Sequence, residues 1–514
     1  MTSSQVGQPP ELNRQESSAI VFIQNHQKLF CIVGVALALA LYLANIPGNG
    51  LRFYVDESSI AYNAYLISRT GADEYGVRWP LYFQAFGEYK NPVYVYLLAA
   101  LFRVFGPSVW LARALGAVAG CAAALLLGLL AWRITALRRV GIIVAVTALL
   151  TPWLFEVSRL VFEVALFPLA LTLFLLAVHG AYRKESWSVL DGVYIAATLG
   201  LVTYTYSIGR LLGPLLAAGL FLFLCRADWR KQRWGIIRAQ AFYGVTLIPL
   251  ALFIWRNPRA LGSRFALLSY LDARRPMGEN LSEFASHFKN NLNPITLLIN
   301  GDKNILHHVP VMGSFLAAAF VLAVIGLALV VRYHWRDSWW RFVLYGLMVS
   351  VLPASLMRDD FHTLRLIPYP IFLLLLGVPV WAWLLDEARQ KVVRQAALAL
   401  LLLIGVQGLV FQWLFHEESP KRNLDMSFSR VFEAALQMPN RPIYLVAGPR
   451  NFGYVQAYWY GLLRGLDATQ FVRLSPGQSA PPGSLVISEA HSLNCPQCRV
   501  IKRDMLYVAY LVVP

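Results

Sequence analysis

Long apolar runs without charge recur along this chain of 514 residues and alternate with polar segments. A helix of roughly 20 apolar residues is long enough to cross the hydrocarbon core of a bilayer. The pattern therefore predicts an α-helical polytopic membrane protein with about eleven transmembrane helices. The predicted spans are residues 29–47, 108–131, 140–156, 163–182, 188–206, 210–225, 240–255, 310–331, 339–356, 366–385 and 396–415.

Basic residues follow every second run and so predict the orientation of the chain. Lys and Arg are enriched in cytoplasmic loops, which places these connections and the N-terminus in the cytoplasm. The residues concerned are Arg133, Arg138, Arg139, Arg183, Lys184, Arg226, Arg230, Lys231, Arg233, Arg238, Arg332, Arg336, Arg389, Lys391 and Arg394. The polar segment 1–28 is then a cytoplasmic N-terminal tail, and the first span is an uncleaved anchor.

Three longer segments face the opposite side under this orientation: the outer loops 48–107 and 256–309 and the C-terminal segment 416–514. The apolar stretch 93–105 in the first loop is too short to span and predicts an interfacial or half-embedded helix. In the C-terminal segment, strand-like runs at 442–447, 484–488 and 506–513 accompany a helix-like stretch at 453–463. Gly and Pro turns separate these runs, which predicts a small extracytoplasmic α/β domain.

Composition supports a membrane protein and argues against nucleic-acid binding. Hydrophobic residues make up 57% of the chain and charged residues 14%, whereas soluble domains carry about 25% charged residues. The net charge of +17 is explained by the cytoplasmic loops, and no basic-aromatic module is present. Membrane lipids, not nucleic acids, are the expected partners.

The pair Cys495 and Cys498 lies near the C-terminus. Such spacing occurs in zinc half-sites, in redox pairs and in short disulfides. A second pair of ligands is missing, which weakens the zinc interpretation. Because the segment is predicted to lie outside the cytoplasm, a structural disulfide is the favoured interpretation.

Polar residues gather at the outer ends of the predicted spans. Placing both signs of charge at membrane depth costs about 2.5–3.5 kcal/mol per residue, so their concentration at one level predicts a shared polar cavity. The residues are Asp56, Glu57, Glu88, Lys90, Glu156, Arg159, Glu163, Arg210, His307, His308, Arg358, Asp359, Asp360, His362 and Arg365.

Several members of this set also have a simpler interpretation. Asp56 and Glu57 could form a solvated turn, and Lys90 could extend to the interface. Glu156, Arg159 and Glu163 share a helical face, which a salt bridge would explain. His362 and Arg365 could anchor the membrane surface, and adjacent histidines such as His307 and His308 rarely bind one metal ion.

Taken together, the set suits an anionic lipid substrate. Arginines and lysines would hold a phosphate, and a carboxylate would accept the proton of an acceptor hydroxyl as general base.

At these residues the chain resembles the lipid-dependent glycosyltransferases of the GT-C fold. The resemblance covers roughly residues 30–380 and is to the bacterial branch of glycosyltransferase family 39, which includes protein O-mannosyltransferases and the aminoarabinose transferase that modifies lipid A. The segments that carry it are YVDE at 54–57, RTGADEYG at 69–76, WPLYF at 79–83, EYKNPVYVY at 88–96, PWLFEVSR at 152–159, GDKN at 301–304 and HTLRLIP at 362–368.

The resemblance implies a GT-C transmembrane catalytic domain at 29–415 and a sugar donor on a polyprenyl phosphate. It also implies an acceptor that enters from the extracytoplasmic side, inversion at the anomeric carbon, and a bacterial inner-membrane location. Asp56 would be the catalytic base, and Glu57 would position the acceptor or the sugar. Lys90, Arg159 and Arg365 would bind the lipid phosphate with help from His362. Glu163 would correspond to the second acidic residue that relatives have in the next outer turn, and Glu88 of the EYKNP segment would also belong to the substrate-binding site.

Departures from the family limit what can be carried over. Relatives often have Lys-Pro-Pro where this chain has Lys90-Asn91-Pro92. The Trp-Trp-Asp signature of oligosaccharyltransferases is absent, so no cofactor or metal dependence is expected. The alternative functions are a transporter or flippase of lipid-linked sugars and a non-catalytic assembly factor. The sugar, the acceptor (lipid, glycan or protein) and the oligomeric state stay open.

Overall fold

The computed structural model describes residues 27–46, 53–225, 229–310, 312–419, 426–446, 453–475, 478–491, 495 and 497–513. Most of the predicted tail 1–28 and the turn at 48–52 lie outside the described residues. The chain divides into two compact units, residues 1–44 and 45–514, which are described separately. The first unit contributes helix α2 (Gln27–Leu43), which covers most of the first predicted span.

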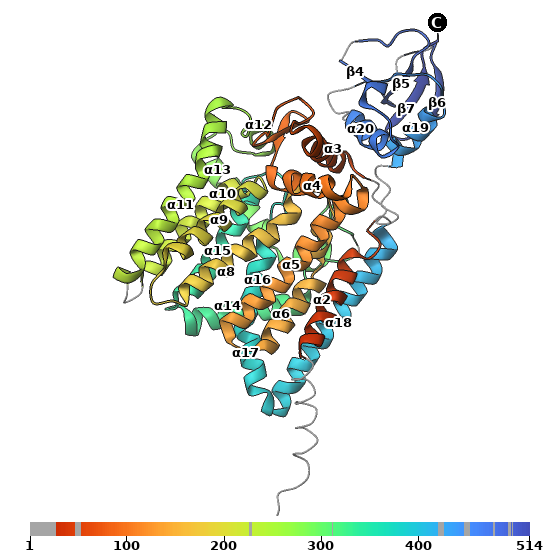
Figure 1. Cartoon of the computed structure of the whole chain (residues 1–514). Helices are drawn as coiled ribbons and strands as arrows, with labels where there is room; N and C mark the ends of the chain where they lie inside the picture. The colour runs from red at the N-terminus through yellow and green to blue at the C-terminus, as the bar shows by residue number, and fades with distance from the viewer. Residues whose placement is uncertain are drawn as a thin grey trace, which may run out of the picture. The chain divides into compact units, whose positions relative to one another are not determined.

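Each of the other predicted spans coincides with helical structure in the second unit (Figure 1). The helices are α5 (Val109–Thr135), α6 (Arg138–Leu150), α7 (Pro152–Ser158), α8 (Phe167–Tyr182), α9 (Val189–Thr205), α10 (Gly209–Gly219), α11 (Trp229–Arg256), α14 (Ala317–Leu329), α15 (Ser338–Ser355), α16 (Tyr369–Leu376), α17 (Val378–Asp386) and α18 (Lys391–Glu418). The predicted span 140–156 is broken, because α6 and α7 meet at 61°. Pro152 opens α7, where its missing N–H costs no hydrogen bond.

Within the described residues, six helices are long and apolar enough to cross a membrane, and the bent pair α6–α7 would be a seventh. Helices α9 and α10 are apolar but shorter. The chain is therefore a multi-pass membrane protein, while the number of about eleven spans stays a prediction.

Close packing between α5 and α6 depends on two glycines that face each other. A Cβ atom on Gly128 would lie 2.5 Å from the carbonyl oxygen of Gly141, and one on Gly141 would lie 2.7 Å from that of Gly128. Small residues of this kind let transmembrane helices approach closely without a hydrophobic driving force between them.

The two outer loops contain their own short elements. The first folds into α3 (Val55–Thr70), the hairpin β1 (Phe83–Ala85) and β2 (Glu88–Lys90), and α4 (Pro92–Phe105). The second contains α12 (Ser263–Leu268) and α13 (Met277–Asn291). The predicted short helix at 93–105 is confirmed as α4, whereas its depth in the membrane stays a prediction.

The C-terminal segment forms the predicted α/β domain. Its elements are α19 (Met426–Leu436), β3 (Ile443–Val446), α20 (Gly453–Leu463), β4 (Phe471–Leu474), β5 (Leu485–Glu489), β6 (Arg499–Arg503) and β7 (Tyr507–Leu511). The five-stranded sheet has the order β4-β3-β5-β7-β6, in which β3 is parallel to both neighbours and β7 is antiparallel to both. The predicted strands correspond to β3, β5 and β7, and the sequence analysis did not anticipate β4 and β6. Cys495 and Cys498 form a disulfide, as expected.

Aromatic residues join this domain to the first outer loop. Trp459 of α20 is fully buried and stacks on Phe53 with ring centroids 5.3 Å apart and on Phe102 of α4 at 5.9 Å. The ring centroids of Tyr458 and of Tyr62 of α3 lie 5.3 Å apart. Burial of such large rings is worth several kcal/mol, so the domain supports α3, the helix that carries Asp56.

The half-buried carboxyl group of Glu74 lies in the same contact. Nδ2 of Asn63 donates to Glu74 at 3.1 Å, and Tyr454 of α20 is a further hydrogen-bond partner. Burial raises the pKa of Glu74 above its ordinary value despite these bonds and the nearby Arg473. A raised pKa favours the neutral acid in the folded state, so Glu74 stabilises the fold at low pH and loses that contribution as the pH rises.

We predict that Glu74→Gln removes this pH dependence. Glutamine has the shape and hydrogen-bonding groups of the neutral acid, so the variant should unfold at a higher temperature than the native protein at pH 8 and at a similar temperature near pH 4.5, the ordinary Glu pKa. Thermal unfolding of the detergent-solubilised protein across this range measures the difference. Identical profiles for the two proteins would contradict the prediction.

Candidate active site

Asp56 and Lys90 come together from two elements of the first outer loop. Asp56 lies in the first turn of α3, where free backbone N–H groups favour negative charge. The hairpin pairs Phe83 of β1 with Lys90 of β2 and so brings the lysine beside this helix end. Nζ of Lys90 donates to Oδ1 of Asp56 at 2.5 Å.

Lys90 is a buried cation among carboxylates. Its side chain is 7% exposed, whereas that of Asp56 is 27% exposed. Burial alone would lower the pKa of Lys90, but Asp56, Glu163 and Glu88 together raise it above the ordinary value. Glu163 also accepts a hydrogen bond from the backbone N–H of Asn91 at 2.8 Å. The lysine is therefore charged and held at one place.

Glu57, the neighbour of Asp56, is fully buried and has a different set of contacts. Arg113 of α5 donates to both of its oxygens, from Nε at 3.1 Å and from Nη2 at 2.8 Å. The backbone N–H groups of Tyr54 and Val161 donate to it at 2.9 Å and 3.1 Å. These four donors occupy the acceptor positions of the carboxylate. Glu57 of α3 is thereby hydrogen-bonded both to α5 and to the backbone at Val161.

A cavity of about 640 Å³ opens beside Asp56. A smaller one of about 120 Å³ adjoins it and shares Asp56, Tyr206, Arg210 and Arg264 with it. Glu88, Lys90 and Glu163 line the smaller cavity, and His307, His362 and Arg365 line the larger. The walls of the larger cavity also include apolar residues: Leu211, Leu250, Ile254, Phe265, Leu268, Leu306 and Met357.

Six of the eight predicted site residues thus line one continuous space: Asp56, Glu88, Lys90, Glu163, His362 and Arg365. The other two, Glu57 and Arg159, line neither cavity. Arg159 is buried, with its guanidinium over the rings of Phe155 at 5.1 Å and Phe415 at 5.6 Å. Its role as a phosphate contact, which the family resemblance implies, stays a prediction.

Two further arginines reach the cavity. Arg264 of α12 pairs with Glu88 of β2, and Arg210 of α10 lies next to Tyr206 in the shared wall. Arg210 belongs to the polar set predicted from the sequence, in which it has no assigned role, whereas Arg264 is not in that set. The available signal for Arg264 was its place among the basic residues of the second outer loop, which did not distinguish it from Arg259, Arg274 or Arg275.

His362 and Arg365 lie in the segment between α15 and α16. Nη1 of Arg365 donates to Oδ2 of Asp359 at 2.9 Å, and Asp359 is largely exposed. Burial and the adjacent Arg365 lower the pKa of His362 to about 3. His362 is therefore neutral at physiological pH, and Arg365 supplies the positive charge.

The GDKN segment at 301–304 positions a second polar cluster. Gly301 has φ +65°, and a Cβ atom there would overlap the ring of His308, so glycine is required. Nδ1 of His308 in turn lies 3.0 Å from Oε2 of Glu156, and the backbone N–H of Val309 donates to Oε1 of Glu156 at 2.6 Å. This tight turn brings Asp302 into contact with Thr363, in the segment between α15 and α16.

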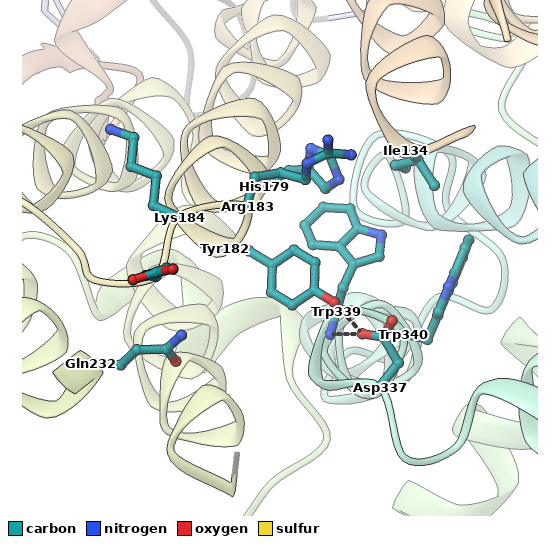
Figure 2. Close-up of a pocket in the computed structure, with 10 residues that line it drawn as sticks. Ile134, His179, Tyr182, Arg183, Lys184, Gln232, Asp337, Trp339 and Trp340 are labelled. Carbon is teal, nitrogen blue, oxygen red and sulfur yellow. Dashed lines mark hydrogen bonds between the residues drawn. The ribbon is translucent and has the colours of Figure 1, made fainter. Parts of the chain in front are cut away.

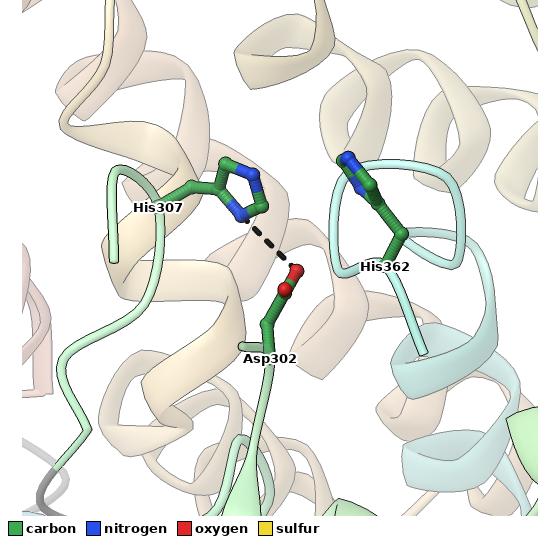
Figure 3. A group of neighbouring side chains, drawn as sticks. All are labelled: Asp302, His307 and His362. Carbon is green, nitrogen blue, oxygen red and sulfur yellow. Dashed lines mark ion pairs between the residues drawn. The ribbon is translucent and has the colours of Figure 1, made fainter. Parts of the chain in front are cut away.

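Asp302, His307 and His362 are the one group among the described residues with metal-ligand character, with candidate ligand atoms within 4.8 Å (Figure 3). However, Asp302 already accepts from Thr363 N–H at 2.7 Å, Thr363 Oγ1 at 2.8 Å and Asn304 N–H at 2.8 Å, and His307 Nδ1 lies 3.2 Å away. Burial alone would raise the pKa of Asp302, but these hydrogen bonds and the neighbouring histidines hold it well below its usual range. Asp302 therefore serves as a hydrogen-bond acceptor that joins two loops.

A second cavity, of about 520 Å³, lies at the other end of α8 and α15 (Figure 2). Along α8, with 16 residues, it is about 24 Å from the start of the helix near Glu163. Two of its charged groups have local partners: Lys184 pairs with Asp191, and Asp337 accepts from Tyr182 and from the N–H of Trp339. None of the predicted site residues lines it, so the cavity beside Asp56 is the candidate active site.

Comparisons with known proteins show the fold. No family model matches the chain, and no curated protein matches it. Among solved structures, it is similar to ArnT from Cupriavidus metallidurans bound to undecaprenyl phosphate, with a TM-score of 0.62 and 13% identity over 94% of this chain and 98% of that one. ArnT from the same organism in the apo state gives a TM-score of 0.61 and 14% identity over 95% and 98%. The chain thus has the GT-C fold that the sequence predicted.

The buried pair Glu57–Arg113 leads to a stability prediction. Removal of one partner leaves an uncompensated buried charge, so Arg113→Ala should lower the free energy of unfolding by about 3–5 kcal/mol. Denaturant titration of the protein in detergent measures this loss.

Arg139→Ala, at an exposed position of α6, is the matched control and should stay within about 0.5 kcal/mol of the native protein. The double variant Glu57→Gln, Arg113→Met should regain part of the stability, because no charge is left unpaired. Equal stability of Arg113→Ala and Arg139→Ala would show that the pair does not hold these segments.

Proposed function

We propose that the chain is an inverting membrane glycosyltransferase that moves a sugar from a polyprenyl phosphate to an acceptor hydroxyl. The observation that carries this is the cavity in which one partly exposed carboxylate, Asp56, meets the cations Lys90, Arg210, Arg264 and Arg365. The fold shared with an ArnT structure bound to undecaprenyl phosphate supports a carrier of that class. The orientation from basic loops supports an active site on the extracytoplasmic side of a bacterial inner membrane.

The cations would bind the phosphate of the donor. Arginine offers planar paired N–H donors that match phosphate oxygens, and lysine adds a point charge. Apolar residues of the larger cavity, such as Ile254 and Phe265, would accommodate the first isoprene units. Because negative charge grows on the phosphate as its bond to the sugar breaks, preorganised cations stabilise the transition state more than the ground state.

Asp56 would act as the general base. The acceptor oxygen attacks the anomeric carbon as its proton passes to Asp56, and the bond from that carbon to the phosphate oxygen breaks, so that polyprenyl phosphate leaves with the electron pair. Lys90 pairs with Asp56 before the donor binds. A bound phosphate would then compete for Lys90 and release the carboxylate for the acceptor.

The remaining predicted residues would hold this arrangement in place. Glu57, with four donors, would position the start of α3 instead of touching a substrate. Glu163 fixes the backbone at Asn91 next to Lys90, and Glu88 holds Arg264. Four cations around the phosphate would supply the charge stabilisation that a metal ion gives in other transferases, so we propose transfer without a metal.

Asp56→Asn tests the catalytic base. The amide still accepts a hydrogen bond from Lys90 but cannot take a proton, so turnover should fall by about 100-fold or more. The assay follows release of undecaprenyl phosphate from undecaprenyl-phosphate-linked sugars by the purified protein. Asp272→Asn, in the second outer loop, is the control and should keep full turnover. Undiminished turnover of the Asp56 variant would exclude this role.

Arg264→Gln tests the phosphate site. Loss of a charged hydrogen bond should weaken binding of undecaprenyl phosphate by about tenfold or more, measured with the protein in nanodiscs. Arg259→Gln, five positions earlier and not in the cavity wall, should bind as the native protein does. Equal affinity of both variants would remove Arg264 from the phosphate site.

A further inference from the structure

The cavity of about 520 Å³ at the other end of α8 and α15 contains buried polar atoms that the proposed transfer does not use. Within the described part of the chain, Nε1 of Trp339, Nδ1 of His179 and Oε1 of Gln232 have no hydrogen-bond partner. All three residues line this cavity and are at most 3% exposed. Figure 2 shows them around it, with the ring centroids of His179 and Trp339 4.8 Å apart. Since buried polar groups are almost always hydrogen-bonded, three such atoms in one cavity indicate a ligand.

The types of these atoms restrict the chemistry of the ligand. The indole N–H of Trp339 can only donate a hydrogen bond, and Oε1 of Gln232 can only accept one. Nδ1 of His179 can take either role. A ligand that satisfies all of them must therefore offer both an acceptor and a donor.

The charges of the lining also have both signs. Its charged residues are two cations and two carboxylates: Arg183, Lys184, Glu185 and Asp337. Nη1 of Arg183 donates to the carbonyl oxygen of Arg133 at 3.3 Å, and no carboxylate among the described residues pairs with Arg183. Because a guanidinium has planar paired N–H donors, Arg183 is suited to a phosphate. The equal number of opposite charges favours a ligand that carries a positive group as well.

An apolar cavity adjoins this polar one. It has a volume of about 510 Å³, shares His179 and Arg183 with the polar cavity, and has Leu129, Trp132 and Ala136 in its remaining wall. A free phosphate or a free amine would have no use for such a wall. Together, the two cavities suit an amphipathic molecule with a polar headgroup and an apolar chain.

The position of the two cavities along the helices matches the boundary of a membrane. They lie about 24 Å along α8 from Glu163, and the hydrocarbon core of a bilayer is about 30 Å thick. Tryptophans such as Trp132 and Trp339 are typical of membrane–water interfaces. The ligand would therefore come from the leaflet opposite the candidate active site, on the predicted cytoplasmic side.

We propose that the two cavities bind one zwitterionic phospholipid whose headgroup carries a primary ammonium, such as phosphatidylethanolamine. Its phosphate accepts from Nε1 of Trp339 and from Arg183, and its ammonium donates to Oε1 of Gln232 and pairs with Glu185. One acyl chain lies against the apolar wall at Leu129. This lipid site is separate from the candidate active site and does not depend on the proposed transfer.

Competition among lipids with the same acyl chains tests the proposal by native mass spectrometry of the delipidated protein. Phosphatidylethanolamine should bind about tenfold more tightly than phosphatidylcholine, whose quaternary ammonium has no N–H group for Gln232. Phosphatidylglycerol should also bind more weakly than phosphatidylethanolamine, because it adds a net negative charge to a lining in which the charges balance.

Two variants assign the two ends of the headgroup. Trp339→Phe keeps an aromatic ring and removes the N–H donor, so it should weaken binding of phosphatidylethanolamine and phosphatidylcholine alike by about tenfold. Gln232→Met keeps the length of the side chain and should remove only the preference for phosphatidylethanolamine, a result that stays informative if Trp339→Phe does not fold. Trp383→Phe, at an exposed position of α17 that lines neither cavity, is the matched control and should bind as the native protein does.

Four results would overturn the proposal. Equal affinity of the native protein for phosphatidylethanolamine and phosphatidylcholine would exclude recognition of the primary ammonium. Tightest binding of phosphatidylglycerol would make this a site for anionic lipids. Unchanged lipid binding in both Trp339→Phe and Gln232→Met would place the lipid elsewhere. Binding of glycerophosphoethanolamine, which has no acyl chains, as tightly as the intact lipid would exclude the apolar cavity from the site.

Discussion

The buried ion pair between Glu57 and Arg113 is the constraint on which the candidate site depends. Both side chains are almost fully buried, and a charge in such a place is tolerated only when it is paired and hydrogen-bonded. The pair satisfies this condition by drawing α3, α5 and the backbone at Val161 together. The first turn of α3 is thereby fixed, and Asp56 with it.

This arrangement gives adjacent carboxylates opposite tasks. Successive residues of a helix point about 100° apart, so Glu57 can face the interior while Asp56 faces the cavity. Asp56, the proposed base, is then partly exposed and has one charged partner, whereas the oxygens of Glu57 already accept from four donors. A transferase of the proposed kind needs both properties, because its base must take up and release a proton while its position stays fixed.

The loops around the cavity are held by the same type of contact. Glu163 holds the backbone beside Lys90, Glu156 holds the segment at Val309, and Asp302 holds the segment at Thr363. Each is a carboxylate that accepts from backbone N–H groups of a sequence-distant loop. Irregular backbone that is buried inside the protein needs such partners, because a buried N–H group without a hydrogen bond costs free energy. Glu163, Glu156 and Asp302 thus have structural contacts. A count of the acidic residues near the site would therefore overestimate the number of catalytic groups.

The sequence by itself determined the membrane class, the positions of the helices, the C-terminal α/β domain and the gathering of polar residues around Asp56, Lys90, His362 and Arg365. These properties follow from local length, hydropathy and loop charge, or from short motifs. It did not determine that Glu57 and Arg159 lie outside the cavity wall, or that Arg264 is part of it. Those features depend on which side of each helix faces a partner brought from 50 or more positions away, and only the packed tertiary structure decides that.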